Sequence, residues 1–429
     1  MAVRGAGKPA ILGGTPVLKR PLPPIHNIGA EEIAAATRVL ERGPLSGFLA
    51  SGKSGFYGGE EVRALEEQFA ERFEIKHALA FNSATTALQA AVAALSIGPG
   101  DEVIVPPYTM SATATAVLLN GAVPIFADID PRTFCIDPVS VRERVTPHTK
   151  AIIAVNLFGQ SADYDALTEI AQEHHLSIIE DNAQAPGARY DGRYTGTIGD
   201  IGVFSFNIHK TIQAGEGGIL VTNSDAYALR AALSRNHGEV AVDEMPGYDL
   251  GPIVGSNYRM TEIAAAIMTV QLRKLEALNH SRIELADHLR GQLEGVPGIT
   301  LPYVHPKSTH VYYRFVLTVN EEEFGISRDR VVDAMNAEGF AMSKGYVKPI
   351  YLLPVFQQRR VFNDTQFPFV YGTYRASQEY TRGLCPVAEE LYEKTCTLTD
   401  VCQHPYTKEH VDLFVTALRK VFAYRDELR

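Results

Sequence analysis

Residues 180–218 read EDNAQAPGARYDGRYTGTIGDIGVFSFNIHKTIQAGEGG, and this stretch holds two polar residues that each follow an apolar run. The run LSIIED at 176–181 is typical of a buried strand that ends in an acid, Asp181. The run IGVFSF at 201–206 leads into the polar segment NIHKTI, which contains Lys210. In open α/β sheets, ligands bind beyond the carboxyl ends of the strands. We therefore expect Asp181 and Lys210 at the ligand-binding edge of one sheet.

Strands and helices alternate around this stretch, from about residue 78 to residue 221. The predicted strands lie at 77–83, 101–108, 123–130, 150–159, 176–181, 201–206 and 217–223, and the predicted helices at 85–95, 111–121, 138–145 and 166–175. Repeated βαβ units of this kind predict a mostly parallel sheet that is covered by helices. The predicted fold class is therefore α/β.

The rest of the chain divides into an arm, the remainder of a large domain and a smaller C-terminal domain. We expect these parts at residues 1–30, 31–275 and 276–429. Further helices are predicted at 31–42, 60–73, 260–295, 327–339 and 411–428, and a further strand at 309–319. A long Gly- and Ser-rich loop at 45–59 separates the first two helices, and a loop of this length is more often functional than passive.

Composition narrows the class of protein. The chain has 429 residues, of which 45% are hydrophobic and 21% charged, as in ordinary globular proteins. The net charge of 40 − 50 = −10 and the lack of a basic run disfavour nucleic acid or an anionic membrane as a partner. Four cysteines occur without a CxxC pair, so we expect reduced thiols, a cytoplasmic protein and no metal site. Neither a signal peptide nor a membrane span is expected.

Lys210, Asp181 and Gln184 together suit the chemistry of pyridoxal 5′-phosphate (PLP). A desolvated lysine forms a Schiff base with an aldehyde, whereas the ordinary alternative is a solvated surface lysine. A carboxylate such as Asp181 pairs with the protonated pyridine nitrogen and makes the ring an electron sink, or it simply caps a turn. Gln184 is a candidate hydrogen-bond partner of the ring's phenolic oxygen, or an ordinary surface amide.

Three other segments offer further candidates with equally ordinary alternatives. Ala84 and Thr85 fall at a predicted helix N-terminus, which binds phosphate or is merely capped. Tyr108 follows the strand VIVPP, where an aromatic ring stacks on a cofactor or packs in the core. Asn257 and Arg259 lie in GSNYRMTEIAAA, where arginine binds an anion or only shapes the loop.

Taken as a set, these segments resemble the DegT/DnrJ/EryC1/StrS family of PLP-dependent sugar and cyclitol aminotransferases. The matching pieces are NSATTAL, VIVPPYT, FADIDPRTFCIDP, NLFGQSADYD, EDNAQAPGA, GDIGVFSFNIHKTIQAGEGG and GSNYRMTEIAAA. They cover most of residues 78–270 in the family's order, and the opening ILGGTPV is similar to its cyclitol and aminoshikimate members. The resemblance implies fold type I of the PLP enzymes and a homodimer with active sites at the subunit interface.

The resemblance also implies a role for each matching residue. Lys210 corresponds to the Schiff-base lysine, Asp181 to the partner of the pyridine nitrogen and Gln184 to the residue near the phenolic oxygen. The remaining cofactor contacts are phosphate ligands, a residue stacked on the ring and a phosphate contact from the neighbouring subunit: Ala84, Thr85 and Ser205, then Tyr108, then Asn257. Arg259 either joins them or only shapes its loop.

The chain departs from the family pattern at three places. Asn156 stands in NLFG where many members have His, so no role of that His is carried over. Tyr351 in PIYLLP takes the place of a family His, which leaves part of the substrate pocket open to question. The loop at 45–59 is longer than the usual turn and adds Lys53 and Tyr57 as unassigned candidates.

These patterns predict an aminotransferase that alternates between the PLP and pyridoxamine phosphate forms, with L-glutamate or L-glutamine as the donor. The acceptor is a keto-sugar nucleotide or a keto-cyclitol in aminosugar or aminocyclitol biosynthesis, for a secondary metabolite such as an antibiotic or for a surface glycan. A diphosphate would require extra basic residues near the cleft, and Lys344, Lys348, Arg359 and Arg360 either serve it or are simply solvated. The alternatives are a sugar dehydratase of the same fold, in which His replaces the lysine, and a non-catalytic PLP-binding sensor.

Overall fold

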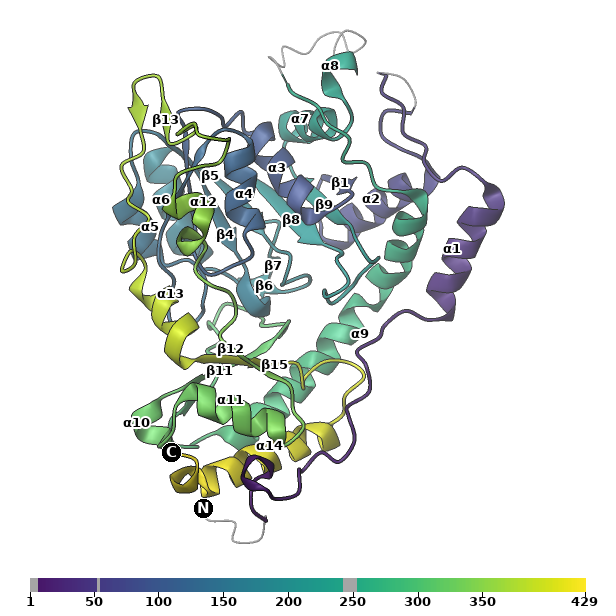
Figure 1. The fold of residues 1–429 in the computed structure, drawn as a ribbon. Coiled ribbons are helices and arrows are strands. Elements are labelled where there is room, and N and C mark those ends of the chain that lie inside the picture. Colours follow the sequence, from purple (N-terminus) through teal and green to yellow (C-terminus); the bar gives the residue numbers. More distant parts are fainter. Residues whose placement is uncertain (1–6, 52–54, 242–252) are drawn as a thin grey trace.

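The computed structural model describes residues 7–51, 55–241 and 253–429, which contain a large sheet and a smaller one (Figure 1). The large sheet runs in the order β1 (His77–Phe81), β9 (Gly218–Thr222), β8 (Ile201–Ser205), β5 (Ser177–Asp181), β4 (Thr149–Val155), β2 (Glu102–Val105) and β3 (Val123–Phe126). All neighbouring strands from β8 to β3 are parallel, whereas β9 runs antiparallel to both of its neighbours, β1 and β8. The mostly parallel sheet predicted from the sequence is therefore confirmed.

Helices cover this sheet, and five of them begin and end close to the predicted positions: α2 (Glu60–Arg72), α3 (Ala84–Ala94), α4 (Ala112–Leu119), α5 (Pro138–Arg144) and α6 (Tyr164–His174). The chain also forms α7 (Asp225–Arg235) and the short α8 (Gly238–Ala241), which were not predicted from the sequence. Strands covered on both faces read as continuous apolar runs, and β2, β3, β8 and β9 are buried at every position. A two-stranded ribbon, β6 (Arg189–Tyr190) and β7 (Arg193–Tyr194), follows β5.

The long helix α9 (Glu262–Leu293) runs from the large sheet to the smaller one (Figure 1). Its first half packs on α1 (Ala30–Arg42) and α2, and it also contacts α14 (Lys408–Ala423). Residues 7–29 form the arm. Its first part lies along the hydrophobic core of the smaller sheet, where Ala10 and Val17 donate backbone hydrogen bonds to the buried Glu338 carboxylate at 2.8 Å each. The arm therefore spans both parts of the molecule.

The smaller sheet is antiparallel, in the order β10 (Ile299–Thr300), β11 (Phe315–Val319), β15 (Cys396–Thr399) and β12 (Met342–Lys344). Beside it lie α10 (Glu321–Phe324), α11 (Arg328–Ala337) and α14. Strand β11 starts later than the predicted strand 309–319, because Val311 leaves the sheet and donates to the carbonyl of Gly159 at 2.8 Å.

A segment of the C-terminal part returns to the large sheet. It contains α12 (Pro354–Gln357), the ribbon of β13 (Val370–Tyr371) and β14 (Tyr374–Arg375), and α13 (Pro386–Glu390). Ile350, Phe356 and Tyr380 belong to the first hydrophobic core, together with Phe126 of β3. The domain boundaries at 30 and 275 stay a prediction. In the described residues, no helix combines the length and apolar character that a bilayer crossing requires.

Candidate active site

Asp181 ends β5 at the carboxyl edge of the large sheet and is only 5% exposed. Its carboxylate accepts hydrogen bonds from the Thr113 hydroxyl at 3.0 Å and from the backbone N–H of Ala183 at 3.2 Å. Burial raises the pKa of this carboxyl, and the positive charge of Lys210 opposes the rise. The fold thus brings Asp181 and Lys210 to the same edge, where their charges act on one another.

Lys210 lies in the turn after β8 and is half-buried. Its backbone N–H donates to the Asn207 carbonyl at 2.9 Å, which fixes the turn. Its Nζ atom lies 4.8 Å from the centre of the Tyr313 ring, within the range of a cation–π contact. Tyr313 belongs to the segment that crosses from the Gly159 loop to β11, so both parts of the fold contribute to the surroundings of the lysine.

Gln184 is buried three residues after Asp181, and both ends of its amide are bonded. Its Oε1 accepts from the Phe158 N–H at 2.9 Å, and its Nε2 donates to the Tyr346 hydroxyl at 2.9 Å. Since Oε1 is bound to a backbone donor, the amide has one fixed orientation. Its second N–H remains available to a ligand oxygen.

The start of α3 and the ends of two strands form a small polar cradle at the same edge. Ser205 of β8 pairs with Gly218 of β9, and Gly218 pairs with Phe81 of β1. A Cβ atom on Gly218 would lie 2.4 Å from the backbone nitrogen of Ala84, so only glycine permits this approach. In the described residues, no hydrogen bond uses the N–H groups of Ala84 or Thr85. The cradle therefore offers free donors to an anion.

The remaining candidates are Tyr108, Asn257 and Arg259, whose contacts do not by themselves indicate a ligand. The Tyr108 ring is fully buried, its hydroxyl accepts from the Tyr346 N–H at 2.8 Å, and its stacking on a cofactor stays a prediction. Asn257 is exposed on a loop that pairs with Asn236. Arg259 donates to the Asn236 side chain at 2.8 Å, which favours a loop-shaping role.

Comparisons with known proteins agree with this geometry. The model of the DegT/DnrJ/EryC1/StrS aminotransferase family matches residues 45–370. The chain belongs to this family. It is similar to L-glutamine:2-deoxy-scyllo-inosose aminotransferase of Streptoalloteichus tenebrarius, with 33% identity over 98% of this chain and 99% of the relative. It is also similar to GDP-perosamine synthase of Caulobacter vibrioides, with 39% identity over 70% and 79% of the two chains.

Among solved structures, the fold is similar to that of the aminotransferase from Psychrobacter cryohalolentis. The TM-score is 0.81 at 32% identity, and the match covers 95% of this chain and all (100%) of that one. The protein is accordingly a PLP-dependent aminotransferase of fold type I.

The residues at the carboxyl edge of this aminotransferase fit the parts of PLP. The buried Asp181 carboxylate, whose pKa is raised, suits a cationic pyridine nitrogen because a positive charge offsets the cost of its burial. The free N–H groups of Ala84 and Thr85 and the hydroxyl of Ser205 suit the phosphate. The free N–H of Gln184 suits the phenolic oxygen, and Lys210 suits the aldehyde carbon.

Two residues at which the aminotransferase departs from its family are structural. Asn156 is fully buried, where it donates to Asn182 at 2.9 Å and accepts from the Tyr164 hydroxyl at 2.8 Å. Tyr351 is also fully buried, and its hydroxyl donates to the Glu389 carboxylate. Because both polar groups are satisfied inside the protein, neither is free to bind a substrate.

The arm of the aminotransferase reaches the turn that carries the lysine. The Asn27 amide donates to the Thr211 carbonyl at 3.0 Å and accepts from the Gln213 amide at 3.1 Å. These bonds hold the backbone directly after Lys210. Residues 1–30 were predicted only as a packing arm, and the structure adds this contact.

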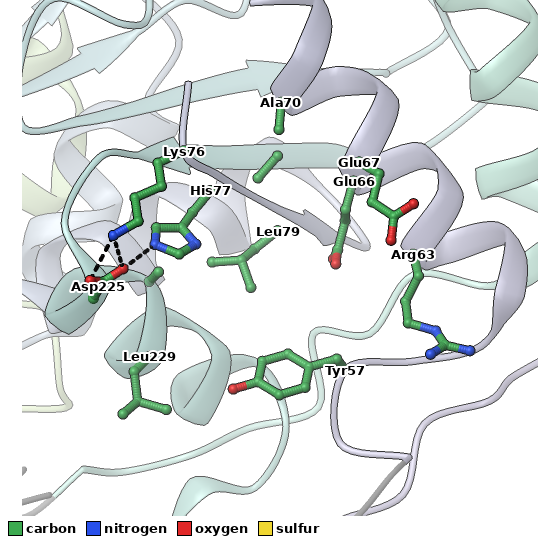
Figure 2. A pocket seen from close by; sticks show the side chains of 12 residues that line it. Tyr57, Arg63, Glu66, Glu67, Ala70, Lys76, His77, Leu79, Asp225 and Leu229 are labelled. Carbon is green, nitrogen blue, oxygen red and sulfur yellow. Dashed lines mark hydrogen bonds and ion pairs between the residues drawn. The ribbon is translucent and has the colours of Figure 1, made fainter. Parts of the chain in front are cut away.

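The 45–59 loop contributes to another part of the surface. Lys53 lies outside the described residues, and Tyr57 lines a cavity of about 560 Å³ between α2, β1 and α7 (Figure 2). Lys76 and His77 both pair with Asp225 there, at 2.7 and 2.5 Å. His77 begins β1, whereas Ala84 follows the end of β1, so this cavity opens toward the edge opposite the cofactor cradle.

Three site residues were not predicted from the sequence: Thr113, Tyr313 and Tyr346. Thr113 lies in the apolar segment SATATAVLL, where the sequence predicts only a packing role in a helix. Its hydroxyl is nevertheless buried near a strand end and donates to the Asp181 carboxylate. Tyr313 and Tyr346 come from the C-terminal part, whose residues reach the site only after the chain has passed along α9. The sequence marks Tyr313 and Tyr346 as site candidates only through their aromatic side chains.

Proposed function

We propose that this aminotransferase moves the amino group of L-glutamine or L-glutamate to the ketone carbon of a cyclitol. The observation that carries the chemistry is that buried Asp181 lies close enough to Lys210 for the lysine charge to oppose the rise in its pKa that burial causes, at the same sheet edge as the free N–H groups of α3. The cyclitol is supported by relatives from two organisms named L-glutamine:2-deoxy-scyllo-inosose aminotransferase, each of which matches 98% of this chain. Such a match includes the arm and the C-terminal part, where acceptor specificity is expected.

The state of three of the four basic candidates also supports an acceptor without a diphosphate, whereas Lys348 is exposed. Lys344 pairs with Asp333 at 2.8 Å, and Arg360 pairs with Asp364. Arg359 pairs with Glu379 at 3.2 Å and also donates to a backbone carbonyl. Each of these cations would have to leave a carboxylate before it could bind a diphosphate.

The cofactor and the residues of the site each have a separate role in the reaction. When bound, PLP supplies an electron sink that stabilises negative charge on the donor's α carbon. The Lys210 amine carries the proton between that carbon and the C4′ carbon of the cofactor, a transfer that typically contributes about 10²–10⁴-fold to the rate. Asp181, held by Thr113, keeps the pyridine nitrogen protonated. The Tyr313 ring lies 4.8 Å from the Lys210 Nζ atom and covers one side of the amine.

We also propose an oligomeric state and a cellular location for the protein. The protein works as a cytoplasmic homodimer that alternates between PLP and pyridoxamine phosphate, and Asn257 reaches the phosphate of the partner subunit. The exposure of Asn257 supports this contact. An aminocyclitol product suits antibiotic biosynthesis.

A keto-sugar nucleotide is the second candidate acceptor, and the 39% identity to GDP-perosamine synthase favours it. The dehydratase alternative is not supported, because Lys210 is present where such enzymes have His. The sensor alternative is not supported either, because the relatives compared are named as enzymes.

The acceptor is tested with a panel of keto-cyclitols and keto-sugar nucleotides offered to the pyridoxamine phosphate form. The return of the PLP absorbance band measures each second half-reaction. We expect keto-cyclitols to restore the band at least about tenfold more efficiently, the equivalent of roughly 1.4 kcal/mol of transition-state binding. A preference of that size for nucleotide-linked ketones would replace the cyclitol by the second candidate.

A further inference from the structure

Tyr346 joins the smaller sheet to two of the predicted cofactor residues. It follows β12, its backbone N–H donates to the Tyr108 hydroxyl at 2.8 Å, and its own hydroxyl accepts from Gln184 at 2.9 Å. Its ring meets those of Tyr108 and Phe158 edge to face, with centres 6.0 and 5.0 Å apart. The backbone and the hydroxyl of Tyr346 are therefore both held by residues that follow strands of the large sheet.

The hydroxyl of Tyr346 accepts a hydrogen bond but, in the described part of the chain, does not donate one. A phenol both accepts and donates, and here the accepting role is taken by Gln184. Tyr346 is half-buried, and a donor that is shielded from water and lacks a partner favours a ligand acceptor at this point.

The groups that face this hydroxyl are those of the active site. Burial raises the pKa of Tyr346 to about 12, Tyr313 and Asp181 add to the rise, and Gln184 and Arg314 oppose it. Tyr346 is therefore a neutral donor at physiological pH. It stands beside the amide that is already expected to meet the phenolic oxygen of PLP.

We propose that the Tyr346 hydroxyl donates a second hydrogen bond to the phenolic oxygen that Gln184 binds. The inference rests on the proposed cofactor role of Gln184 and extends the site to a residue of the C-terminal part. Two donors hold the oxygen as a phenolate and compete with the neighbouring Lys210 nitrogen for its charge. The pair therefore lowers the pKa of the cofactor-bound Lys210 nitrogen, on which Asp181 and Tyr313 also act.

The test is Tyr346→Phe, which keeps the ring and removes only the hydroxyl. The PLP-loaded variant and wild type are titrated with pH while the visible absorbance band is followed. We expect the pKa of the cofactor-bound Lys210 nitrogen to rise by about one unit in the variant, the size of one hydrogen bond to a charged oxygen. Tyr380→Phe is the matched control, because that buried hydroxyl donates to the Pro124 carbonyl at 2.9 Å and should leave the titration unchanged.

An unchanged pKa in Tyr346→Phe overturns the inference. If the acceptor's KM rises while the pKa stays fixed, the hydroxyl faces the substrate, and the inference is again wrong. The titration needs no amino acceptor, so it can be read even if every ketone of the panel fails. A wild type without a visible band overturns the cofactor assignment itself, and the inference with it.

Discussion

Lys210→Ala is expected to lower the rate of amino transfer by about 10⁴-fold, the upper end for the loss of a positioned proton carrier. The amine of Lys210 is the proton carrier between two carbon atoms, and Ala has no group that replaces it. The turn itself is held by Asn207 and Asn27 through backbone atoms, so the variant should fold normally. Steady-state kinetics with a keto-cyclitol and L-glutamine measure the loss.

Lys150→Ala serves as the control for this variant. Lys150 is exposed on β4, and its removal should leave the rate within about twofold, as for most surface substitutions. A purified Lys210→Ala protein that transaminates at nearly the wild-type rate would show that another residue carries the proton.

Asp181→Asn should lower the rate by roughly 10²–10³-fold, as is typical when one preorganised electrostatic partner is removed. The amide keeps the shape of the carboxylate and its contact with Thr113, but it has no negative charge to hold the pyridine nitrogen protonated. Burial raises the pKa of Asp181, because a charged carboxylate loses its hydration inside the protein. The variant should therefore melt no lower than wild type in the absence of cofactor.

The control for Asp181→Asn is made at Asp200, which directly precedes β8 and lies beside the start of β5. Asp200 accepts a hydrogen bond from the backbone N–H of Ile178 at 2.8 Å, so Asp200→Asn tests a carboxylate next to β5 but far from its carboxyl end. We expect it to keep nearly full activity. Equal losses of activity in the two variants would mean that Asp181 acts through the stability of β5 and not through its charge.

Much of the large sheet could be predicted, because the apolar runs of β4, β5 and β8 are continuous and end in polar residues. The same rule placed Asp181 and Lys210 at one edge. It did not reveal Tyr346, since a loop after a short antiparallel strand reaches the site only through long-range packing. Thr113 was missed because nothing in an apolar helix marks which hydroxyl meets an acid.

Two residues that the sequence suggested as substrate contacts have other surroundings in the fold. Tyr351 stands where family members have a His, yet its ring is fully buried and its hydroxyl is bonded to Glu389. Tyr57 lies in a conspicuous loop, and the loop brings it to the cavity beside β1. A departure from a family pattern marks a changed environment, and only the contacts show whether that environment is a pocket or a core.

The central claim, that an amino group passes through this site to a ketone, is tested most directly with labelled donor. L-Glutamine carrying ¹⁵N on its α-amino group is incubated with the PLP-loaded protein and a keto-cyclitol, and the mass of the product is measured by mass spectrometry. The account predicts an aminocyclitol one mass unit heavier than that formed from unlabelled donor. An unlabelled amine, or a donor consumed without any amine product, would contradict it.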